Sequence, residues 1–364
     1  MRWDAQALSP ARGLASDNSG NMPSGPAPAM EALLPLAGLV RSVSTPEFSG
    51  VTFHEVTAKS VLNKVPSGSA MPFEWTVNPY RGCSHACVYC FARKSHTYLE
   101  FDAGRDFDSQ VVVKINAAEV LRKELAKPSW QRHQVALGTN TDPYQRAEGR
   151  YALMPGIIRA LADSGTPFSI LTKGTLLARD IPLLKHAATQ VPVDLGISLA
   201  MTNEDLAELI EPGTPSPRAR FKLIARLRDA GLGCGVMAMP ILPWLTDSDA
   251  ALDALFTELA KAGATGVTAG ALYLKPGTRE WYMSWLAAQH PELVGKYRRL
   301  YGQGSYASKE YRSWLAGRIS FFKAKHGFTG SSGFSHRNAR PTDGSGAPSG
   351  AKAAAPLPVQ EPLF

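Results

Sequence analysis

The sequence has no long apolar run. No stretch of the 364-residue chain approaches the roughly 20 consecutive apolar residues that a helix needs to cross a bilayer. The first residues, MRWDAQALSPARG, also lack the apolar core of a secretory signal peptide. We therefore expect neither a membrane-spanning nor a secreted protein, and we predict a cytoplasmic location.

Cysteine is scarce and unevenly placed. The chain has four cysteines, and three of them fall within eight residues. Three neighbouring cysteines are too close together, and odd in number, for the disulfide framework of a small secreted protein. Metal binding in a reducing compartment is the better interpretation.

Charged residues are also few, at 19% of the chain, against 44% hydrophobic residues. This balance belongs to globular proteins and excludes a mainly disordered or fibrous chain. Lys and Arg outnumber Asp and Glu, which gives a formal net charge of +8. A basic protein of this size tends to bind phosphate-bearing or otherwise acidic partners.

Composition divides the chain into four segments. Residues 1–45 and 329–364 are rich in Ala, Pro, Ser and Gly, and we predict a disordered leader and a disordered tail there. Short apolar runs alternate with amphipathic segments over residues 46–278, which we predict to be one core domain. The pattern becomes helical over residues 279–328, the predicted C-terminal extension.

The core alternates between strand and helix patterns. Helix patterns follow the apolar runs, at 113–127, 154–165, 203–210, 216–233 and 247–263. Crossover connections are right-handed, so strands are added in one direction. The pattern predicts an α/β fold, a partial parallel (β/α)6 TIM-like barrel with its ligands at the carboxyl ends of the strands. The predicted strands are FEWTVNPY (73–80), QVALGT (134–139), FSILTK (168–173), PVDLGISLA (192–200), LGCGVMAMPI (232–241) and GVTAGALYL (266–274).

The three neighbouring cysteines lie directly after the first predicted strand. In NPYRGCSHACVYCFAR, Cys83, Cys87 and Cys90 have C-x3-C-x2-C spacing. Thiolates are soft ligands that suit zinc or an iron–sulfur cluster. A Cys3His zinc site with His85 or His96 is one alternative. A [4Fe–4S] cluster on three cysteines is the other, and it leaves one iron open for chemistry.

This spacing, with Tyr89 immediately before the third cysteine, resembles the signature of the radical S-adenosylmethionine (SAM) superfamily. The resemblance implies a [4Fe–4S] cluster whose open iron is chelated by SAM. It also implies a reductant such as a flavodoxin or ferredoxin, and cleavage of SAM to methionine and a 5′-deoxyadenosyl radical that takes a hydrogen from the substrate. Tyr89 would pack near the adenine, and its alternative role is that of a core aromatic. No catalytic residue beyond the cluster ligands is predicted.

Later segments resemble the spore photoproduct lyase-like subgroup, and the resemblance implies contacts to SAM at the ends of successive strands. Each group of residues also has an alternative role. The alternatives are an Asx-type turn before Pro143 for the second-strand segment, a solvated residue for Lys173, a mutual ion pair or helix cap for Glu211 and Arg220, and apolar packing for Ile241. The implied contacts are Thr139, Asn140, Thr141 and Asp142 in ALGTNTDPYQ, Thr172 and Lys173 in LTKGTLLARD, Ser198 in GISLA, Glu211 and Arg220 in the segment that begins EPG, and Ile241 in MPILPWLTD.

The chain departs from spore photoproduct lyases at one point. Those enzymes carry a hydrogen-donating cysteine in the second-strand segment, where this chain has Gly138, Thr139 and Asn140. The fourth cysteine, Cys234, lies early in the fifth strand and is predicted to be a small buried hydrophobe. The resemblance therefore implies radical chemistry but does not identify the substrate.

The helical extension is basic and aromatic. Residues 279–325 contain nine Lys or Arg and three Glu. Cations that follow phosphates and aromatics that stack on unpaired bases would make a nucleic-acid surface, consistent with DNA repair. The alternative is an amphipathic cap with its aromatics buried against the barrel. The aromatics concerned are Trp281, Tyr282, Trp285, Tyr297, Tyr301, Tyr306, Tyr311 and Trp314.

The chain ends in PVQEPLF. This terminus resembles the pentapeptide by which bacterial repair proteins and polymerases dock on the sliding clamp, through Gln360, Leu363 and Phe364. Glu361 and Pro362 depart from the usual residues between them, and the alternative is a tail end without a binding role.

The leading hypothesis is a radical SAM enzyme that acts on a nucleic-acid or other large substrate. Two other functions compete with it. One is a zinc- or cluster-stabilised nucleic-acid-binding protein without turnover, and the other is a radical SAM enzyme that acts on a protein or a small molecule.

Overall fold

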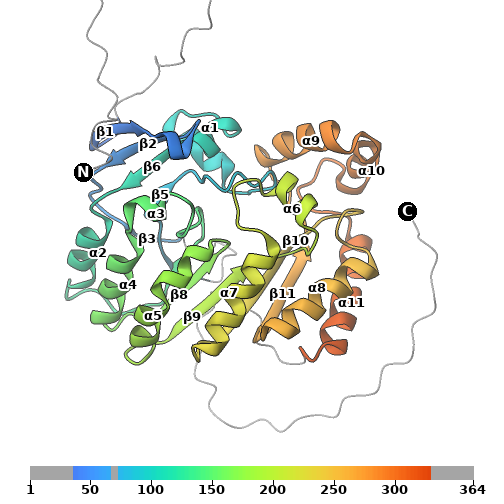
Figure 1. Ribbon diagram of the computed structural model, residues 1–364. Coiled ribbons are helices and arrows are strands. Elements are labelled where there is room, and N and C mark those ends of the chain that lie inside the picture. Colours follow the sequence, from blue (N-terminus) through green and yellow to red (C-terminus); the bar gives the residue numbers. More distant parts are fainter. Residues whose placement is uncertain (1–35, 67–72, 329–364) are drawn as a thin grey trace, which may run out of the picture.

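The computed structural model describes residues 36–66 and 73–328 (Figure 1). The predicted tail, with Gln360, Leu363 and Phe364, lies outside the described residues, as does most of the predicted leader. None of the helices in the described ranges has the length and apolar character that a bilayer crossing requires.

The described residues form two sheets, and the larger has the strand order β11-β10-β9-β8-β7-β4-β3. Neighbouring strands from β4 to β11 are parallel, whereas β3 pairs antiparallel with β4 at one edge. The two edge strands do not pair with each other, so the barrel is open. This confirms the partial parallel barrel. The strands are β3 (Leu62–Lys64), β4 (Trp75–Val77), β7 (Val135–Leu137), β8 (Phe168–Thr172), β9 (Val193–Ser198), β10 (Cys234–Ile241) and β11 (Gly266–Ala271).

Helices cover the outer face of this sheet (Figure 1). The longest of them begin at serine N-caps, where the Ser216 hydroxyl accepts from the Ala219 amide and the Ser248 hydroxyl from the Ala251 amide. The helices of the core are α1 (Arg105–Ser109), α2 (Ala117–Leu125), α3 (Glu148–Tyr151), α4 (Met154–Asp163), α5 (Ile181–Ala188), α6 (Glu204–Ile210), α7 (Pro217–Asp229) and α8 (Asp249–Ala262), with the 3-10 turns η2 (Pro46–Phe48), η3 (Arg93–Leu99) and η4 (Thr175–Asp180).

The smaller sheet, with strand order β1-β2-β6-β5, was not predicted. Its strand β1 (Leu39–Ser44) falls in the segment expected to be a disordered leader, and that expectation is wrong for these residues. The strand pairs with β2 because Val43 is buried and Arg41 forms an ion pair with Glu55 (Nε–Oε2 2.7 Å). The other strands are β2 (Thr52–Val56), β5 (Tyr80–Arg81) and β6 (Gln110–Lys114).

Strand β6 also corrects the helix predicted over residues 113–127. Its three consecutive valines, Val111–Val113, are β-branched and buried, and they favour a strand between β2 and β5. The helix begins only at Ala117. The strand predicted over residues 73–80 is likewise shorter, because Tyr80 pairs with Val113 in the smaller sheet.

The C-terminal extension consists of α9 (Thr278–Gln289), α10 (Pro291–Tyr301) and α11 (Lys309–Lys325). Four of its tyrosines are buried, and three of their hydroxyls donate to the barrel. Tyr297 donates to the Pro243 carbonyl (2.9 Å), Tyr301 to the Leu272 carbonyl (2.8 Å) and Tyr311 to Asp247 (2.8 Å), while Tyr282 donates to Tyr297 (3.0 Å). Most aromatics of the extension are therefore packing residues, as the cap alternative predicts. Tyr306, Trp314 and Phe321 remain exposed.

Gly138 is the glycine on which the second strand end depends. Its φ is +90°, and a Cβ atom built there would lie 1.9 Å from the Leu171 carbonyl oxygen of β8. The close approach of the two strand ends thus requires a residue without a side chain.

Gly138→Ala should lower the free energy of unfolding by roughly 3 kcal/mol or more, since left-handed strain and a backbone collision act together. Gly231→Ala is the matched control, because Gly231 has a φ of +77° but nothing within 4 Å of its Cβ position. It should cost only about 1–2 kcal/mol. Denaturant unfolding of both variants measures the difference, and equal losses would contradict the close approach at Gly138.

Candidate functional site at the mouth of the barrel

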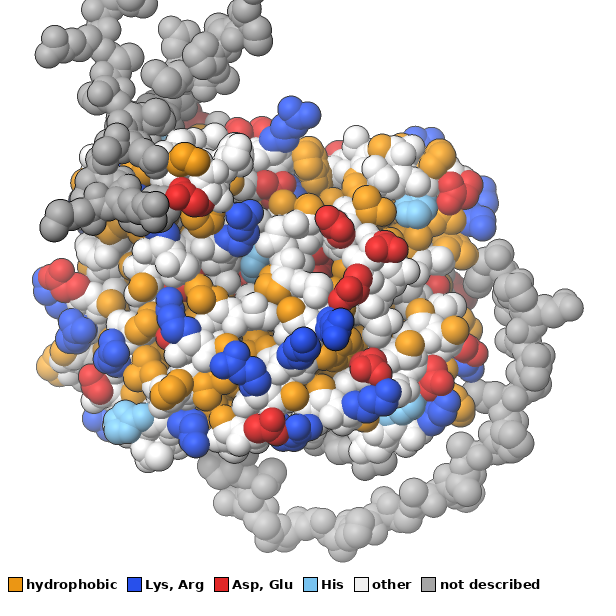
Figure 2. Space-filling model, in the orientation of Figure 1, with side chains coloured by type: hydrophobic (Ala, Val, Ile, Leu, Met, Phe, Trp, Pro, Cys, Tyr) orange, Lys and Arg blue, Asp and Glu red, His pale blue; other side chains and the backbone are white. Residues whose placement is uncertain are grey.

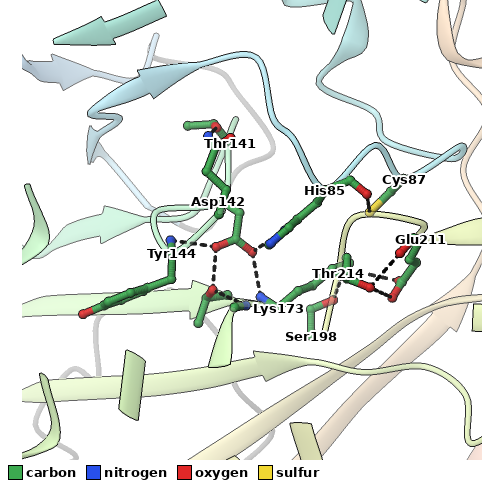
Figure 3. A network of polar contacts seen from close by, with 12 residues as sticks. His85, Cys87, Thr141, Asp142, Tyr144, Lys173, Ser198, Glu211 and Thr214 are labelled. Atoms are coloured by element: carbon green, nitrogen blue, oxygen red, sulfur yellow. Dashed lines mark hydrogen bonds and ion pairs between the residues drawn. The ribbon is translucent and has the colours of Figure 1, made fainter. Parts of the chain in front are cut away.

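The cysteine loop, residues 82–91, follows β5 and lies over the carboxyl ends of the barrel strands (Figure 3). Its backbone is fixed to neighbouring segments, because the Cys83 amide donates to the Phe107 carbonyl (2.8 Å) and the Val88 amide to the Ile210 carbonyl (3.0 Å). Gly213 packs so closely beneath the loop that a Cβ atom there would lie 2.0 Å from the Ser84 carbonyl oxygen. The loop is therefore held from several sides.

The three thiols of this loop are free and near one another. Cys83 and Cys87 are each 7% exposed, and Cys90 is partly buried. Burial raises the pKa of Cys87 well above its usual range, with further contributions from Glu211, Cys90 and Cys83, whereas Lys173 acts in the opposite direction. Burial, followed by Cys83, raises the pKa of Cys90 to about 11. Three converging soft donors with cations beside them fit a cluster that carries thiolates.

The two histidines of the zinc alternative have partners outside the three thiols, although His85 also interacts with the Cys83 thiol. The Nδ1 atom of His85 lies 3.3 Å from the Asp142 carboxylate. The Nε2 atom of His96 is hydrogen-bonded to the Gln110 carbonyl (2.9 Å). Within residues 36–66 and 73–328, no three His, Cys, Asp or Glu side chains are arranged around a single ion position. The thiolates of a cubane bind three separate irons, so they need not surround one point.

Arg93 anchors the cysteine loop on the side of α9, and no pattern in the sequence indicated this role. Its guanidinium is completely buried and donates to the Cys87 carbonyl (2.9 and 3.2 Å), to the Gly104 carbonyl (2.7 Å) and to Asp108 (2.9 Å). It also lies 4.8 Å from the Trp281 ring of α9. A sequence pattern gives no signal for this clamp, because its partners are carbonyls and an acid brought close only by folding.

Asp142 connects the loop to two strand ends (Figure 3). Its carboxylate accepts from the Tyr144 amide (2.8 Å), the Lys173 amide (2.7 Å) and the Thr172 hydroxyl (2.5 Å), and it pairs with His85. Burial would lower the pKa of His85, but Asp142 and Cys83 outweigh it and raise that pKa to about 10. The Tyr144 contact is the Asx-type turn that was the alternative role of Asp142.

The neighbours of Asp142 also bond within the protein. The hydroxyls of Thr139 and Thr76 are hydrogen-bonded to each other (2.7 Å), and the Thr141 hydroxyl donates to the Gly82 carbonyl (2.8 Å). Asn140 is exposed, and its amide lies 3.4 Å from the Asn78 side-chain oxygen. The ALGTNTDPYQ segment therefore supports the cysteine loop, and among these residues Asn140 has the most accessible side chain.

A second polar group joins the ends of β8 and β9 to α7. Lys173 is not a solvated residue, because its side chain is 13% exposed and its Nζ atom donates to the Ser198 hydroxyl (2.5 Å). The same Nζ atom lies 3.7 Å from Glu211 and 5.7 Å from the Tyr89 ring centre. Lys173 thus places a positive charge at the mouth, beside the cysteine loop.

Glu211 and Arg220 form a buried ion pair, with Nη2 to Oε2 at 2.6 Å. Arg220 also donates to the Ser198 carbonyl (3.0 Å), and the Tyr89 hydroxyl donates to Glu211. Burial would raise the pKa of Glu211, but Arg220 and then Lys173 outweigh it and lower that pKa to about 2. The carboxylate therefore stabilises the fold above about pH 4.5, and this contribution is lost as the pH falls towards 2. The mutual pairing that was one alternative for these residues is present.

Two further residues singled out in the sequence lie on β10. Ile241 is fully buried at the end of β10, after a cis Met239–Pro240 peptide bond. Cys234 is 1% exposed at the opposite end of the same strand, so the prediction of a buried hydrophobe is confirmed. The structure thus brings together Tyr89, Asp142, Thr172, Lys173, Ser198, Glu211 and Arg220 at the mouth.

An open parallel barrel with a three-cysteine loop after its first strand defines an α/β-barrel protein whose site lies at the strand ends. Residues 77–256 match the family model of the Radical SAM superfamily. The chain belongs to this superfamily and is an enzyme that uses a [4Fe–4S] cluster and SAM together with a reductant.

Two of the sequence relatives are uncharacterised proteins. An uncharacterised protein of Mycobacterium tuberculosis is 55% identical over 364 residues, which is 100% of both chains. An uncharacterised protein of Methanocaldococcus jannaschii is 27% identical over 201 residues, or 55% of this chain and 71% of the relative.

Solved structures of spore photoproduct lyase share the fold. One, complexed with dinucleoside spore photoproduct, has a TM-score of 0.55 and 17% identity, covering 75% of this chain and 79% of that chain. A variant with bound AdoMet and dinucleoside spore photoproduct has a TM-score of 0.55 and 14% identity, covering 73% and 76%. The similarity confirms the barrel architecture.

Arg220→Met should lower the free energy of unfolding by about 3–5 kcal/mol, because it leaves Glu211 buried without its main partner. Arg218→Ala is the control, since Arg218 is an exposed residue on the same helix and should change stability by less than about 0.5 kcal/mol. Denaturant unfolding at pH 7 provides the comparison. Similar small losses in both variants would show that the pair contributes little.

Proposed function

We propose that Cys83, Cys87 and Cys90 hold the [4Fe–4S] cluster and that the enzyme abstracts hydrogen from a nucleic-acid substrate, in the manner of a DNA-repair or nucleic-acid-modifying enzyme. The observation that carries the cluster assignment is the convergence of three buried or half-buried free thiols over the strand ends, with Lys173 beside them. The fourth cysteine is at the opposite end of its strand.

The bound cluster, once reduced, would supply the electron that cleaves SAM to methionine and a 5′-deoxyadenosyl radical. The residues of this chain position SAM and balance charge. Lys173 presents an ammonium group for the methionine carboxylate, and Ser198 and Glu211 hold that ammonium in place. Tyr89, fixed by its hydroxyl on Glu211, supplies a flat apolar surface beside the loop.

Asn140, Thr139 and Thr141 stand at the end of β7, where the resemblance implies the methionine amino group. Asp142 acts on SAM indirectly in this proposal, by fixing the backbone amide of Lys173. The side chain of Ile241 is fully buried, so its part in this proposal is the backbone edge that the resemblance implies for the adenine.

The nucleic-acid substrate is supported by charge and by the structural relatives. The chain has a net charge of +8, and its C-terminal extension is basic. The spore photoproduct lyase structures bind a dinucleoside spore photoproduct. Figure 2 shows acidic side chains over α6, whose first turn contains Glu204 and Asp205, so we expect a polyanion to approach the mouth from another side.

Cys87→Ala tests the cluster assignment. After anaerobic reconstitution and reduction, this variant should lose the iron bound by the wild type and should form no 5′-deoxyadenosine from SAM. Cys234→Ala is the matched control, because Cys234 is also a buried free thiol, and it should retain both. Wild-type iron content in Cys87→Ala, or loss of iron in both variants, would refute the ligand assignment.

Lys173→Ala tests the proposed carboxylate contact. It should weaken SAM binding to the reconstituted enzyme by roughly 10- to 100-fold, the value of a charge-assisted hydrogen bond, while iron content stays unchanged. Lys185→Ala, on the exposed surface of α5, should bind SAM as the wild type does. Equilibrium dialysis with labelled SAM measures both, and unchanged affinity in Lys173→Ala would remove Lys173 from the SAM site.

A further inference from the structure

Three exposed aromatic side chains form a surface beside the mouth that the SAM chemistry does not use. Phe91 is 40% exposed, Tyr273 36% and Tyr306 60%. We call these three residues the aromatic stripe. They come from three different segments, namely the residue after Cys90, the residues after β11, and the connection between α10 and α11.

Residues 272–275, directly after β11, form a short extended segment with one buried side and one outward side. Leu272 and Leu274 are 2% and 1% exposed, whereas Tyr273 and Lys275 alternate with them and face the other side. The Leu274 amide donates to the Ser305 carbonyl (2.8 Å), and Tyr273 forms an antiparallel bridge with Tyr306. The exposed rings are therefore held by the backbone.

The two tyrosine rings lie against each other. Their centres are 4.6 Å apart with an interplanar angle of 39°, and the Arg312 guanidinium lies 5.4 Å from the Tyr306 ring centre. This pair differs from the buried tyrosines of the extension, whose rings pack beneath the surface. Tyr273 and Tyr306 instead present apolar rings to solvent next to a cation.

The other end of the stripe reaches the cysteine loop. The Lys275 Nζ atom lies 5.4 Å from the Phe91 ring centre, and the Thr278 hydroxyl donates to the Cys90 carbonyl (2.9 Å). The turn that follows Lys275 is thus anchored on a proposed cluster ligand. A molecule lying along the stripe would therefore reach Phe91, the residue next to Cys90.

Cations accompany the rings along this path. Lys275 lies over Phe91 and Arg312 over Tyr306, and the exposed Lys94 lies near Gly277, which is in the turn that follows Lys275. Alternating ring faces and cations match the chemistry of unpaired nucleotides, whose bases stack on aromatics and whose phosphates bind Lys and Arg. A duplex keeps its base faces covered, so it could use only the cations.

We propose that the aromatic stripe is a docking surface for single-stranded nucleic acid, which guides an unpaired nucleotide to the mouth beside Cys90. This inference rests on the proposed function, in which the substrate is a nucleic acid. It adds the strandedness of the substrate and the residues that bind it. Lys275 and Arg312 contact phosphates in this arrangement, and Phe91, Tyr273 and Tyr306 contact bases.

Binding of a fluorescent dT12 oligonucleotide to the reconstituted enzyme, followed by anisotropy, tests the proposal. Tyr306→Ala should weaken binding by about 10-fold, because one stacked base is lost. Lys275→Gln should weaken binding and reduce the slope of log K against log salt by about 1. Trp314→Ala is the matched control, since Trp314 is 43% exposed on α11 and lies outside the stripe, and it should bind as the wild type does.

Three results would overturn the docking surface: no binding of dT12 by the wild type, equal affinities of Tyr306→Ala and Trp314→Ala, or equally tight binding of a duplex or of polyglutamate. Formation of 5′-deoxyadenosine from SAM is measured on the same protein preparations without dT12, and it should be the same in Tyr306→Ala as in the wild type. If the wild type forms 5′-deoxyadenosine but does not bind dT12, only the proposals of a nucleic-acid substrate and of the docking surface are refuted. If the wild type binds dT12 through the stripe but makes no 5′-deoxyadenosine, the radical assignment fails instead.

Discussion

The carboxylate of Asp142 is the constraint on which the mouth of the barrel depends. It follows β7, yet it accepts hydrogen bonds from the end of β8 and pairs with His85 in the cysteine loop. A single buried charge with this many donors is satisfied only when all three segments are in place. The loop that carries the thiols is therefore positioned by the strand ends themselves, and Arg93 holds it independently from the side of α9.

Charge balance explains why the second polar group sits next to that loop. Glu211 is buried and is neutralised by Arg220, so Lys173 is left with a longer 3.7 Å contact and a hydroxyl partner. An ammonium group held this way keeps capacity for an anionic ligand. The Tyr89 ring is fixed by the same carboxylate, and one acid thereby orients both the cation and the flat surface that we propose for SAM.

The parts of the fold that local patterns encode could be predicted, and the parts made by distant pairing could not. Apolar runs and the C-x3-C-x2-C spacing are contiguous, so they gave the barrel strands and the cysteine loop. The smaller sheet depends on β1 and β2 finding β6, more than 50 residues away from β2, and no local pattern marks that pairing. For the same reason the roles of Arg93 and of the His85–Asp142 pair became visible only in three dimensions, and the buried tyrosines of the extension could not be distinguished from exposed ones.

The second-strand segment also bears on how the reaction ends. The cysteine that the resemblance to spore photoproduct lyases implies for this segment is absent, and Gly138, Thr139 and Asn140 at those positions have other roles. Gly138 has no room for a side chain next to the Leu171 carbonyl, and the Thr139 hydroxyl is committed to Thr76. Asn140 alone has an accessible side chain, and an amide is a poor hydrogen-atom donor compared with a thiol. None of the three side chains is a thiol, so this segment supplies no cysteine that could return a hydrogen atom to a product radical in the proposed reaction.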